Sequence, residues 1–276
     1  NGGIGTYVKA ASESHADAGD RANDAVRING RELRCKVVGE GGNLGFTQRG
    51  RIEAALHGNG GAGVGMNTDA IDNSAGVDTS DHEVNIKILL GLAMADGEMT
   101  AKQRNTLLAS MTDEVAALVL RDNTFQTQCL SITRRLGPRL LEQEARFMRY
   151  LEKQGKLNRA IEFLPSDDEI AERKALGGER ACLTTPERAV LLAYCKMWLF
   201  DEILASDLPE DEWVGTALAR YFPATLRERM AAYIPRHPLK REIVATHVLN
   251  SMVNRVGATF THRITEMTSA KPALVV

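Results

Sequence analysis

The spacing of apolar residues divides the chain into two parts near residue 96. Before that point the apolar runs are short and glycines interrupt them, whereas after residue 100 apolar positions recur every three or four residues between glycine and proline stops. The first pattern is typical of short strands and turns, and the second is typical of helices. The sequence therefore predicts a mainly α protein, with a small α/β part at residues 1–96 and a helical domain at residues 97–276.

Two short strands and one helix are predicted within the α/β part. Residues 34–38 and 66–71 are apolar stretches near glycine, which is the usual setting of a short strand. Between them, residues 47–57 place Ile52 and Leu56 at helical spacing. A strand, a helix and a strand in this order predict a parallel pair joined by a right-handed crossover.

Capping residues indicate where later helices begin. Ser80 and Glu83 fit the S-x-x-E capping box ahead of an apolar run, so a helix is expected to begin near Ser80 and to end at about residue 95. Ser166 and Glu169 form a second box of this kind. Further helix stops are expected at Gly137-Pro138, Gly177-Gly178, Thr185-Pro186 and the four later prolines.

The last long helix is expected to carry one continuous apolar stripe. Leu249, Val253, Val256 and Phe260 follow one another at intervals of three or four residues and would share a helix face. Such a face predicts packing, either within the chain or against another subunit.

Composition excludes several classes of protein. With 276 residues, of which 43% are hydrophobic, the chain can bury a core without a metal or a disulfide. The 34 basic and 36 acidic residues give a formal net charge of -2, so no overall field favours nucleic acid or an anionic membrane. Apolar runs are far shorter than the ~20 residues of a membrane span. No signal peptide is recognised, and the four widely spaced cysteines fit reduced thiols in a cytoplasmic protein.

Cysteine and histidine spacing argues against a metal site. The four cysteines lie far apart and form no C-x-x-C pair, which fits reduced thiols. Among the histidines, His82 lies beside Asp81 and Glu83, but adjacent side chains of a helix point in different directions. No metal is therefore expected.

Three stretches rich in glycine or small residues are candidate binding segments. Residues 58–63 fit G-x-G-x-x-G but follow a predicted helix rather than a strand, so a flexible loop is expected. Residues 39–43 follow a predicted strand, where glycines permit a plain turn or the close approach of a flat ring beside the Asn43 amide. Residues 73–80 precede a predicted helix, where an anion can bind or Ser80 can simply cap the helix.

Several of these segments together resemble glutamate dehydrogenases. VVGEGGNLGFT resembles the V-A-E-G-A-N-x-P-T-T segment of that family, and NSAGVDTSDHE resembles its N-A-G-G-V-x-x-S-x-x-E segment, in the same order. NGGIGTYVKA, TTPERAVLLAYCKMWLFDEIL, RYFPATLRERM and HPLKREIVATHVLNSMVNRVGATF are similar to the large bacterial NAD-specific class, so the likeness covers nearly the whole chain. It implies that residues 1–96 are the distal part of a Rossmann-like NAD-binding domain, an incomplete parallel sheet, followed by a helical C-terminal domain at residues 97–276.

The resemblance also implies a reaction and a set of contacts. The reaction is the oxidative deamination of L-glutamate to 2-oxoglutarate and ammonium, in which hydride passes to NAD. The residues carried over are Gly41, Gly42, Asn43 and Asn73 for the cofactor, and Val77 and Ser80 for the substrate. In the family the Ser hydroxyl donates to the glutamate side-chain carboxylate, and the full-length enzyme is expected to be a homo-oligomer.

The chain is expected to be a fragment of that enzyme. It opens on NGGIGTYVKA, which reads like the middle of a longer polypeptide, and the family's catalytic lysine and aspartate belong to segments that precede these motifs. We therefore assign no catalytic residue and expect no dehydrogenase turnover from the isolated chain. Gly45 also departs from the family pattern, where a proline is expected. The alternative is a helical interaction or regulatory module with a glycine-rich linker and no small-molecule site.

Overall fold

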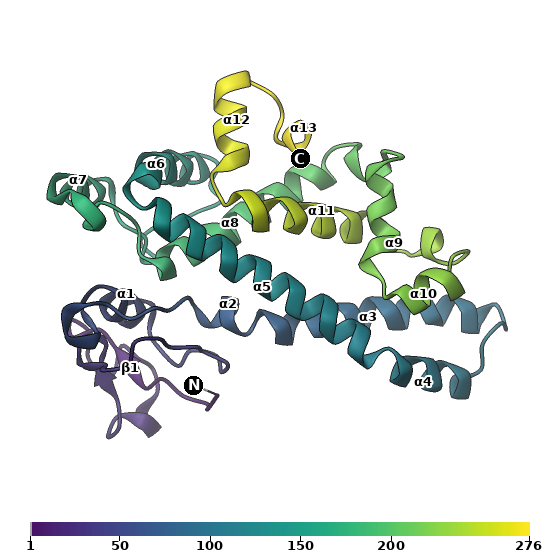
Figure 1. Ribbon diagram of the computed structural model, residues 1–276, viewed down its shortest axis with the longest axis horizontal. Helices are drawn as coiled ribbons and strands as arrows, with labels where there is room; N and C mark the ends of the chain where they lie inside the picture. Colours follow the sequence, from purple (N-terminus) through teal and green to yellow (C-terminus); the bar gives the residue numbers. More distant parts are fainter. Residues whose placement is uncertain (1) are drawn as a thin grey trace.

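The computed structural model describes residues 2–276, with every side chain in that range except that of Glu179. The strands are β1 Val8–Lys9 and β2 Ile28–Asn29. The helices of the first part are η1 Arg21–Asn23, η2 Gly30–Glu32, α1 Gln48–His57, η3 Asn59–Gly61, α2 Asp69–Asp72 and α3 Ser74–Ala95. They are followed by α4 Ala101–Ser110, α5 Thr112–Leu136, α6 Pro138–Lys153, α7 Asp167–Leu176, η4 Gly178–Arg180, α8 Thr185–Leu204, η5 Leu208–Glu210, η6 Val214–Thr216, α9 Ala217–Tyr221, α10 Ala224–Arg229, η7 Ile234–Arg236, α11 Lys240–Val256, α12 Phe260–Thr268 and α13 Pro272–Val275. The small α/β part lies at one end of this helical molecule (Figure 1), so a mainly α fold with a small α/β part is confirmed.

Very short parallel pairing holds the α/β part together. In β1 and β2, Val8 lies opposite Ile28, and Val8 also forms a parallel bridge with Phe46. Val8 and Phe46 are buried together with Ala54 and Val64 in a small apolar core. This core fixes the segment that leads into α1 against β1.

The strands predicted at residues 34–38 and 66–71 are wrong. The two segments meet at a single parallel bridge between Val37 and Gly65, and Ile71 belongs to α2 instead. Val37 is 72% exposed. Parallel strands are stable when both faces are covered, and the exposed Val37 leaves one side of this pairing open to solvent. The observed strands β1 and β2 escaped prediction because two residues are too few to show an alternating pattern.

The helix predicted at residues 47–57 is confirmed as α1. Thr47 is its N-cap, and its hydroxyl oxygen accepts a hydrogen bond from the Gly50 amide at 2.9 Å. Such a cap satisfies one of the amides that a helix leaves unpaired at its start.

The predicted helix start at Ser80 is wrong, because α3 begins at Ser74. Ser80 lies inside the helix, where its hydroxyl donates to the Gly76 carbonyl at 3.4 Å. A serine within a helix can bond the carbonyl four residues earlier instead of capping. The predicted end is confirmed, since α3 stops at Ala95.

Two apolar cores organise the helical part. One lies among α5, α6, α7, α8 and α11 and includes Phe147 and Trp198. The other joins α3 and α4 to α9, α10 and α11 and includes Leu89 and Phe222. The buried face of α3 therefore packs against the helical part of the chain. There α5 crosses α3 (Figure 1).

Two predicted boundaries in the helical part are confirmed. The capping box of α7 is present, with the Ser166 amide donating to the Glu169 carboxylate at 2.7 Å and the Ser166 hydroxyl accepting from the Glu169 amide at 3.2 Å. At the predicted stop, Gly137 has a φ of 47° between the end of α5 and Pro138, the first residue of α6.

The single apolar stripe predicted near the end of the chain is wrong. Leu249 and Val253 are buried in α11, but Val256 is 42% exposed and ends that helix. Gly257 follows with a φ of 84°, which breaks the helix, and Phe260 begins α12. The buried half of the stripe packs within the chain.

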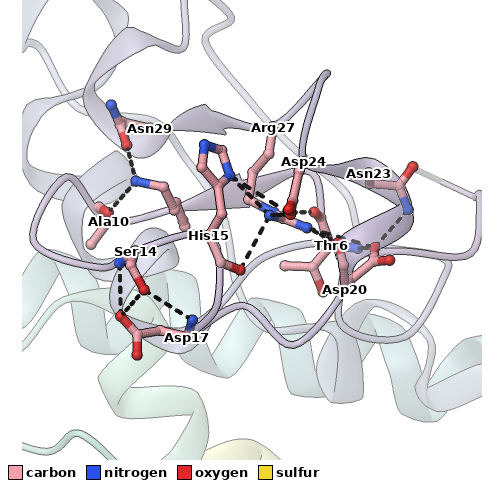
Figure 2. Close-up of polar contacts among 11 residues, drawn as sticks. Thr6, Ala10, Ser14, His15, Asp17, Asp20, Asn23, Asp24, Arg27 and Asn29 are labelled. Atoms are coloured by element: carbon pink, nitrogen blue, oxygen red, sulfur yellow. Dashed lines mark hydrogen bonds and ion pairs between the residues drawn. The ribbon is translucent and has the colours of Figure 1, made fainter.

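A buried arginine holds the long loop between β1 and β2 (Figure 2). The Arg27 Nε donates to the Thr6 carbonyl at 2.7 Å, and its Nη1 lies 3.0 Å from His15 Nδ1 and also donates to Asp24. Its Nη2 donates to the Asp20 carbonyl. One guanidinium thus joins three points of the loop, His15, Asp20 and Asp24, to Thr6 before β1.

Two kinds of feature are absent from residues 2–276. None of the helices in this range has the length and apolar character needed to cross a membrane. Over the same residues, no group of three or more His, Cys, Asp or Glu side chains is arranged to hold a metal ion.

Candidate nicotinamide and substrate site

The glycine-rich segment at residues 39–45 forms an exposed turn. Asn43 and Leu44 are both exposed, and Leu44 has a φ of 55°, in the left-handed region. The chain then enters the core at Phe46, which is only 4% exposed. The side-chain amide of Asn43 makes no hydrogen bond within residues 2–276, which leaves its donor and acceptor free to bind a ligand.

Two carboxylates fasten this turn to α2. The Leu44 amide donates to Asp69 Oδ2 at 2.7 Å, and the Glu40 amide donates to Asp72 Oδ2 at 2.9 Å. The two contacts bracket residues 41–43 on both sides. Because Asp72 is followed directly by Asn73, the turn that carries Asn43 lies against the segment that leads into α3.

A buried ion pair between Arg51 and Glu40 holds the beginning of the same turn. The Arg51 Nε donates to Glu40 Oε2 at 2.7 Å and its Nη2 donates to Glu40 Oε1 at 2.9 Å, with Asp69 3.1 Å away. Glu40 is 1% exposed and Arg51 4%. Burial raises the pKa of Glu40, although Arg51 favours the charged form of its carboxyl group. A bidentate contact of this kind fixes orientation as well as position.

Two of the candidate residues that follow, Val77 and Ser80, lie along one exposed face of α3. Val77, Ser80 and Val84 are spaced by three and four residues, which places them on the same side of the helix, and the half-buried Asn73 directly precedes the helix as its N-cap. Val77 is 73% exposed and Val84 is 55% exposed, and Ser80 is exposed as well. Aliphatic side chains suit the apolar part of an amphipathic ligand, and the Ser80 hydroxyl can donate to its polar part by giving up the 3.4 Å bond to the Gly76 carbonyl.

Two glycines contribute to the site in different ways. A Cβ on Gly76 would lie 2.9 Å from Asn73 Oδ1, so this glycine leaves room for the Asn73 side chain over the first turn of α3. A Cβ on Gly42 would lie 2.5 Å from the Gly3 carbonyl oxygen, so its missing side chain serves packing against the start of the chain. Gly41 is exposed beside it.

The predicted residues are therefore brought together in two groups. The turn with Gly41, Gly42 and Asn43 lies against α2 beside Asn73, while Val77 and Ser80 lie farther along the same exposed face of α3. A cavity of about 810 Å³ lies elsewhere, between α1 and the loop before α7, and is lined by Arg49, Leu56 and Phe163 among others. None of the six predicted residues lines that cavity.

Sequence reasoning missed the residues that hold the turn in place. Glu40 stands inside the quoted motif, but its partner Arg51 is eleven positions away on α1. Asp69 was assigned to a strand that was expected to end at Ile71, just before Asp72. These contacts could have been expected only from the knowledge that a charged residue is buried. The burial of Arg51 depends on the tertiary fold and cannot be read from the sequence.

Two family models match the chain. Residues 1–133 match the family model described as "Bacterial NAD-glutamate dehydrogenase, catalytic domain", and residues 180–276 match "Glutamate dehydrogenase, C-terminal". Both models describe dehydrogenases of glutamate. The chain belongs to the bacterial NAD-glutamate dehydrogenase family.

Similar proteins match along the full chain. The NAD-specific glutamate dehydrogenase of Pseudomonas aeruginosa is 52% identical over 275 residues, or 100% of the chain. Proteins with the same name from Halomonas elongata and Mycobacterium tuberculosis are 50% and 49% identical, each over 99% of the chain. The chain spans 16% of the length of each of these relatives.

Proposed function

We propose that this chain supplies the nicotinamide-facing and glutamate-facing side chains of an NAD-dependent glutamate dehydrogenase. The reaction is the oxidative deamination of L-glutamate to 2-oxoglutarate and ammonium. The observation that supports it most strongly is the attachment of the Asn43 turn to Asp69 and Asp72, directly before Asn73 and the helix that carries Val77 and Ser80. A ring held at the turn would have the exposed face of α3 beside it.

The residues of the turn would hold the cofactor. The free amide of Asn43 can donate to and accept from a carboxamide, and the exposed backbone at Gly41 leaves space for a flat ring. Gly42 would keep the backbone of the turn close to residue 3. Asn73 would complete the cofactor side of the site. When bound, NAD supplies the acceptor for the hydride that leaves the glutamate α-carbon.

The face of α3 would hold the substrate. The Ser80 hydroxyl would donate to the side-chain carboxylate of glutamate, and Val77 would pack against its methylene groups. These residues orient the substrate and transfer no proton. Holding the two reactants in alignment is itself a large part of catalysis in a hydride transfer.

Substitution of Ser80 by Ala tests the substrate assignment. In an enzyme of the relatives' full length that contains this chain, Ser80→Ala should raise KM for glutamate about tenfold, because a hydrogen bond to a charged group is lost. KM for NAD should change less than twofold. Ser131→Ala is a matched control, because Ser131 is an exposed helical serine whose hydroxyl also donates to the carbonyl four residues earlier.

Substitution of Asn43 by Ala tests the cofactor assignment in the same enzyme. It should raise KM for NAD about tenfold and leave KM for glutamate within twofold of the wild type, because it removes a donor and an acceptor for the carboxamide. Unchanged values for both substrates in both variants would support the alternative of a helical module without a small-molecule site.

We also propose, from the family resemblance, that the full-length enzyme is a cytoplasmic homo-oligomer with a Rossmann-like cofactor domain. The buried half of the α11 stripe packs within the chain, so it gives no support to assembly. Light scattering on the full-length protein is the direct test, and a monomer would contradict the assembly.

A further inference from the structure

The first two turns of α3 have no buried anchor of their own. The buried residues of this helix are His82, Asn85, Ile86, Leu89, Leu90 and Ala93, and all of them follow Ser80. Apolar packing therefore fixes the second half of α3, while the first half, with Val77 and Ser80, depends on polar contacts. These contacts come from the helical part of the chain.

Tyr221, the last residue of α9, holds α3 one residue beyond Ser80. Its hydroxyl donates to Asp81 Oδ2 at 2.7 Å and accepts from Asn85 Nδ2 at 2.9 Å, so it joins two successive turns of α3. Its ring stacks on His82, with ring centroids 4.4 Å apart and an interplanar angle of 19°. Burial, reinforced by the Asp81 carboxylate, raises the pKa of Tyr221, so the phenol keeps the proton that it donates.

Asn123 of α5 holds the beginning of the same helix. Its Nδ2 donates to the Ser74 hydroxyl at 2.8 Å and to the Ile71 carbonyl at 3.0 Å. These contacts satisfy groups at the junction of α2 and α3, beside Asn73. Asn123 and Tyr221 thus fix the two ends of the segment that carries Val77 and Ser80.

We infer that Tyr221 and Asn123 are positioning residues for glutamate binding, which act by fixing the exposed face of α3. The inference rests on the proposed function, since it requires Val77 and Ser80 to contact the substrate. It gives the helical part of the chain a role in the site, because both residues lie beyond residue 96 and neither lies on the exposed face. Neither residue is expected to contact glutamate itself.

The test uses steady-state kinetics of an enzyme of the relatives' full length that contains this chain. Tyr221→Phe removes only the hydroxyl and keeps the ring on His82, and Asn123→Ala removes the other anchor. Each should raise KM for glutamate about three- to tenfold and leave KM for NAD within twofold, since only the substrate face is displaced. Tyr194→Phe is the matched control, because the Tyr194 hydroxyl donates to Glu162 at 2.7 Å and, within residues 2–276, makes no hydrogen bond to α3.

A pair of substitutions at Asp81 separates positioning from a loss of stability. Asp81→Asn keeps an oxygen that accepts from Tyr221 and should retain a KM for glutamate within twofold of the wild type. Asp81→Ala lacks that oxygen and should match Tyr221→Phe. This pair decides the question even if the Tyr221 variant fails to fold.

The inference and the proposed function fail in different ways. If Ser80→Ala raises KM for glutamate while Tyr221→Phe, Asn123→Ala and Asp81→Ala all behave like the Tyr194 control, the positioning role is wrong and the site assignment stands. If Ser80→Ala also has a wild-type KM for glutamate, the proposed function is wrong and the inference falls with it.

Discussion

The Arg51 side chain shows how one buried charge can define a loop. Its guanidinium contacts both oxygens of Glu40 and one oxygen of Asp69, and these two acidic residues lie on opposite sides of the turn at Asn43. Buried ion pairs add little net stability compared with apolar packing, but each partner is strongly required once the other is present. The main role of this ion pair is therefore to restrict the turn to one conformation.

Removal of Arg51 should destabilise the chain strongly. Arg51→Met leaves the Glu40 carboxyl group buried without its partner, and the free energy of unfolding is expected to fall by about 3–5 kcal/mol. Urea denaturation measures this change. Arg146→Met is the control, because the side chains of Arg146 and its partner Glu266 are 39% and 37% exposed, and such surface pairs contribute only about 0–1 kcal/mol. Equal losses in the two variants would contradict this account of Glu40.

Asp78 should make stability depend on pH. Burial, with further contributions from Asp122 and Asp81, raises the pKa of Asp78 to about 6 from an ordinary value of 3.8. The other charged or titratable groups that act on it or face it are Lys196, Arg121 and His82. The folded chain thus binds this proton more tightly than the unfolded chain does. The contribution of Asp78 to the free energy of unfolding should fall as pH rises from about 4 to about 6.

Asp78→Asn removes this titration. Relative to the wild type, the variant should gain stability as pH rises through that interval, and its advantage should level off above about pH 7. Urea denaturation of both proteins between pH 4 and pH 8 gives the difference directly. A constant difference across the range would show that Asp78 titrates at its ordinary value.

At the scale of elements, the glycines between α1 and α2 are required by backbone geometry. Gly60, Gly61 and Gly63 all have positive φ values, and a Cβ on Gly63 would lie 2.4 Å from the Ala55 carbonyl oxygen. The segment was expected to be a flexible loop, and its glycines instead allow the chain to pass closely over the end of α1. No ligand is needed to explain them.

Substitution of two glycines by alanine should change stability in opposite directions. Gly63→Ala meets both a left-handed backbone and a close carbonyl, and it should lower the free energy of unfolding by more than about 1 kcal/mol. Gly91→Ala lies in an exposed turn of α3 with no atom within 4 Å of the new Cβ, and it should raise stability by about 0.5–1 kcal/mol. Thermal or urea unfolding of both variants checks the pair.

At the scale of the whole molecule, the core that contains α3 joins the two parts of the chain. Leu89 of α3 and Phe222, which follows α9, are both 0% exposed and belong to the same apolar cluster. The division at residue 96 therefore falls after a helix whose buried face packs in the helical part. Whether the two parts fold as separate domains stays a prediction, and the shared core favours one cooperative unit.

Phe222→Ala tests this coupling. The substitution opens a cavity where helices from both parts meet, and it should lower the free energy of unfolding by about 3–5 kcal/mol. Unfolding followed by far-ultraviolet circular dichroism and by tryptophan fluorescence should shift together. Two separate transitions, of which only one responds to the substitution, would indicate that the parts unfold independently.

The sequence by itself determined the local features of this protein. The α1 helix follows from Thr47 and the spacing after it, and the start of α7 follows from Ser166 and Glu169, because caps and periodicity act over a few residues. The six candidate site residues came from quoted motifs, which order residues along the chain and leave their separation in space open. The predictions of the strands, of the start of α3 and of the last apolar stripe were wrong. Each of these features depends on packing against segments that are distant in the sequence.

Only the tertiary structure decided how the motifs are held. Arg51 reaches Glu40 across eleven positions, Asp72 reaches the Glu40 amide across thirty-two, and Tyr221 reaches Asp81 across one hundred and forty. Contacts of this kind leave no local periodicity, because they depend on which distant segments the apolar cores bring side by side. The residues proposed to touch ligand were therefore named from sequence motifs and stay a prediction, whereas the residues that hold their segments in place are visible only in the tertiary structure.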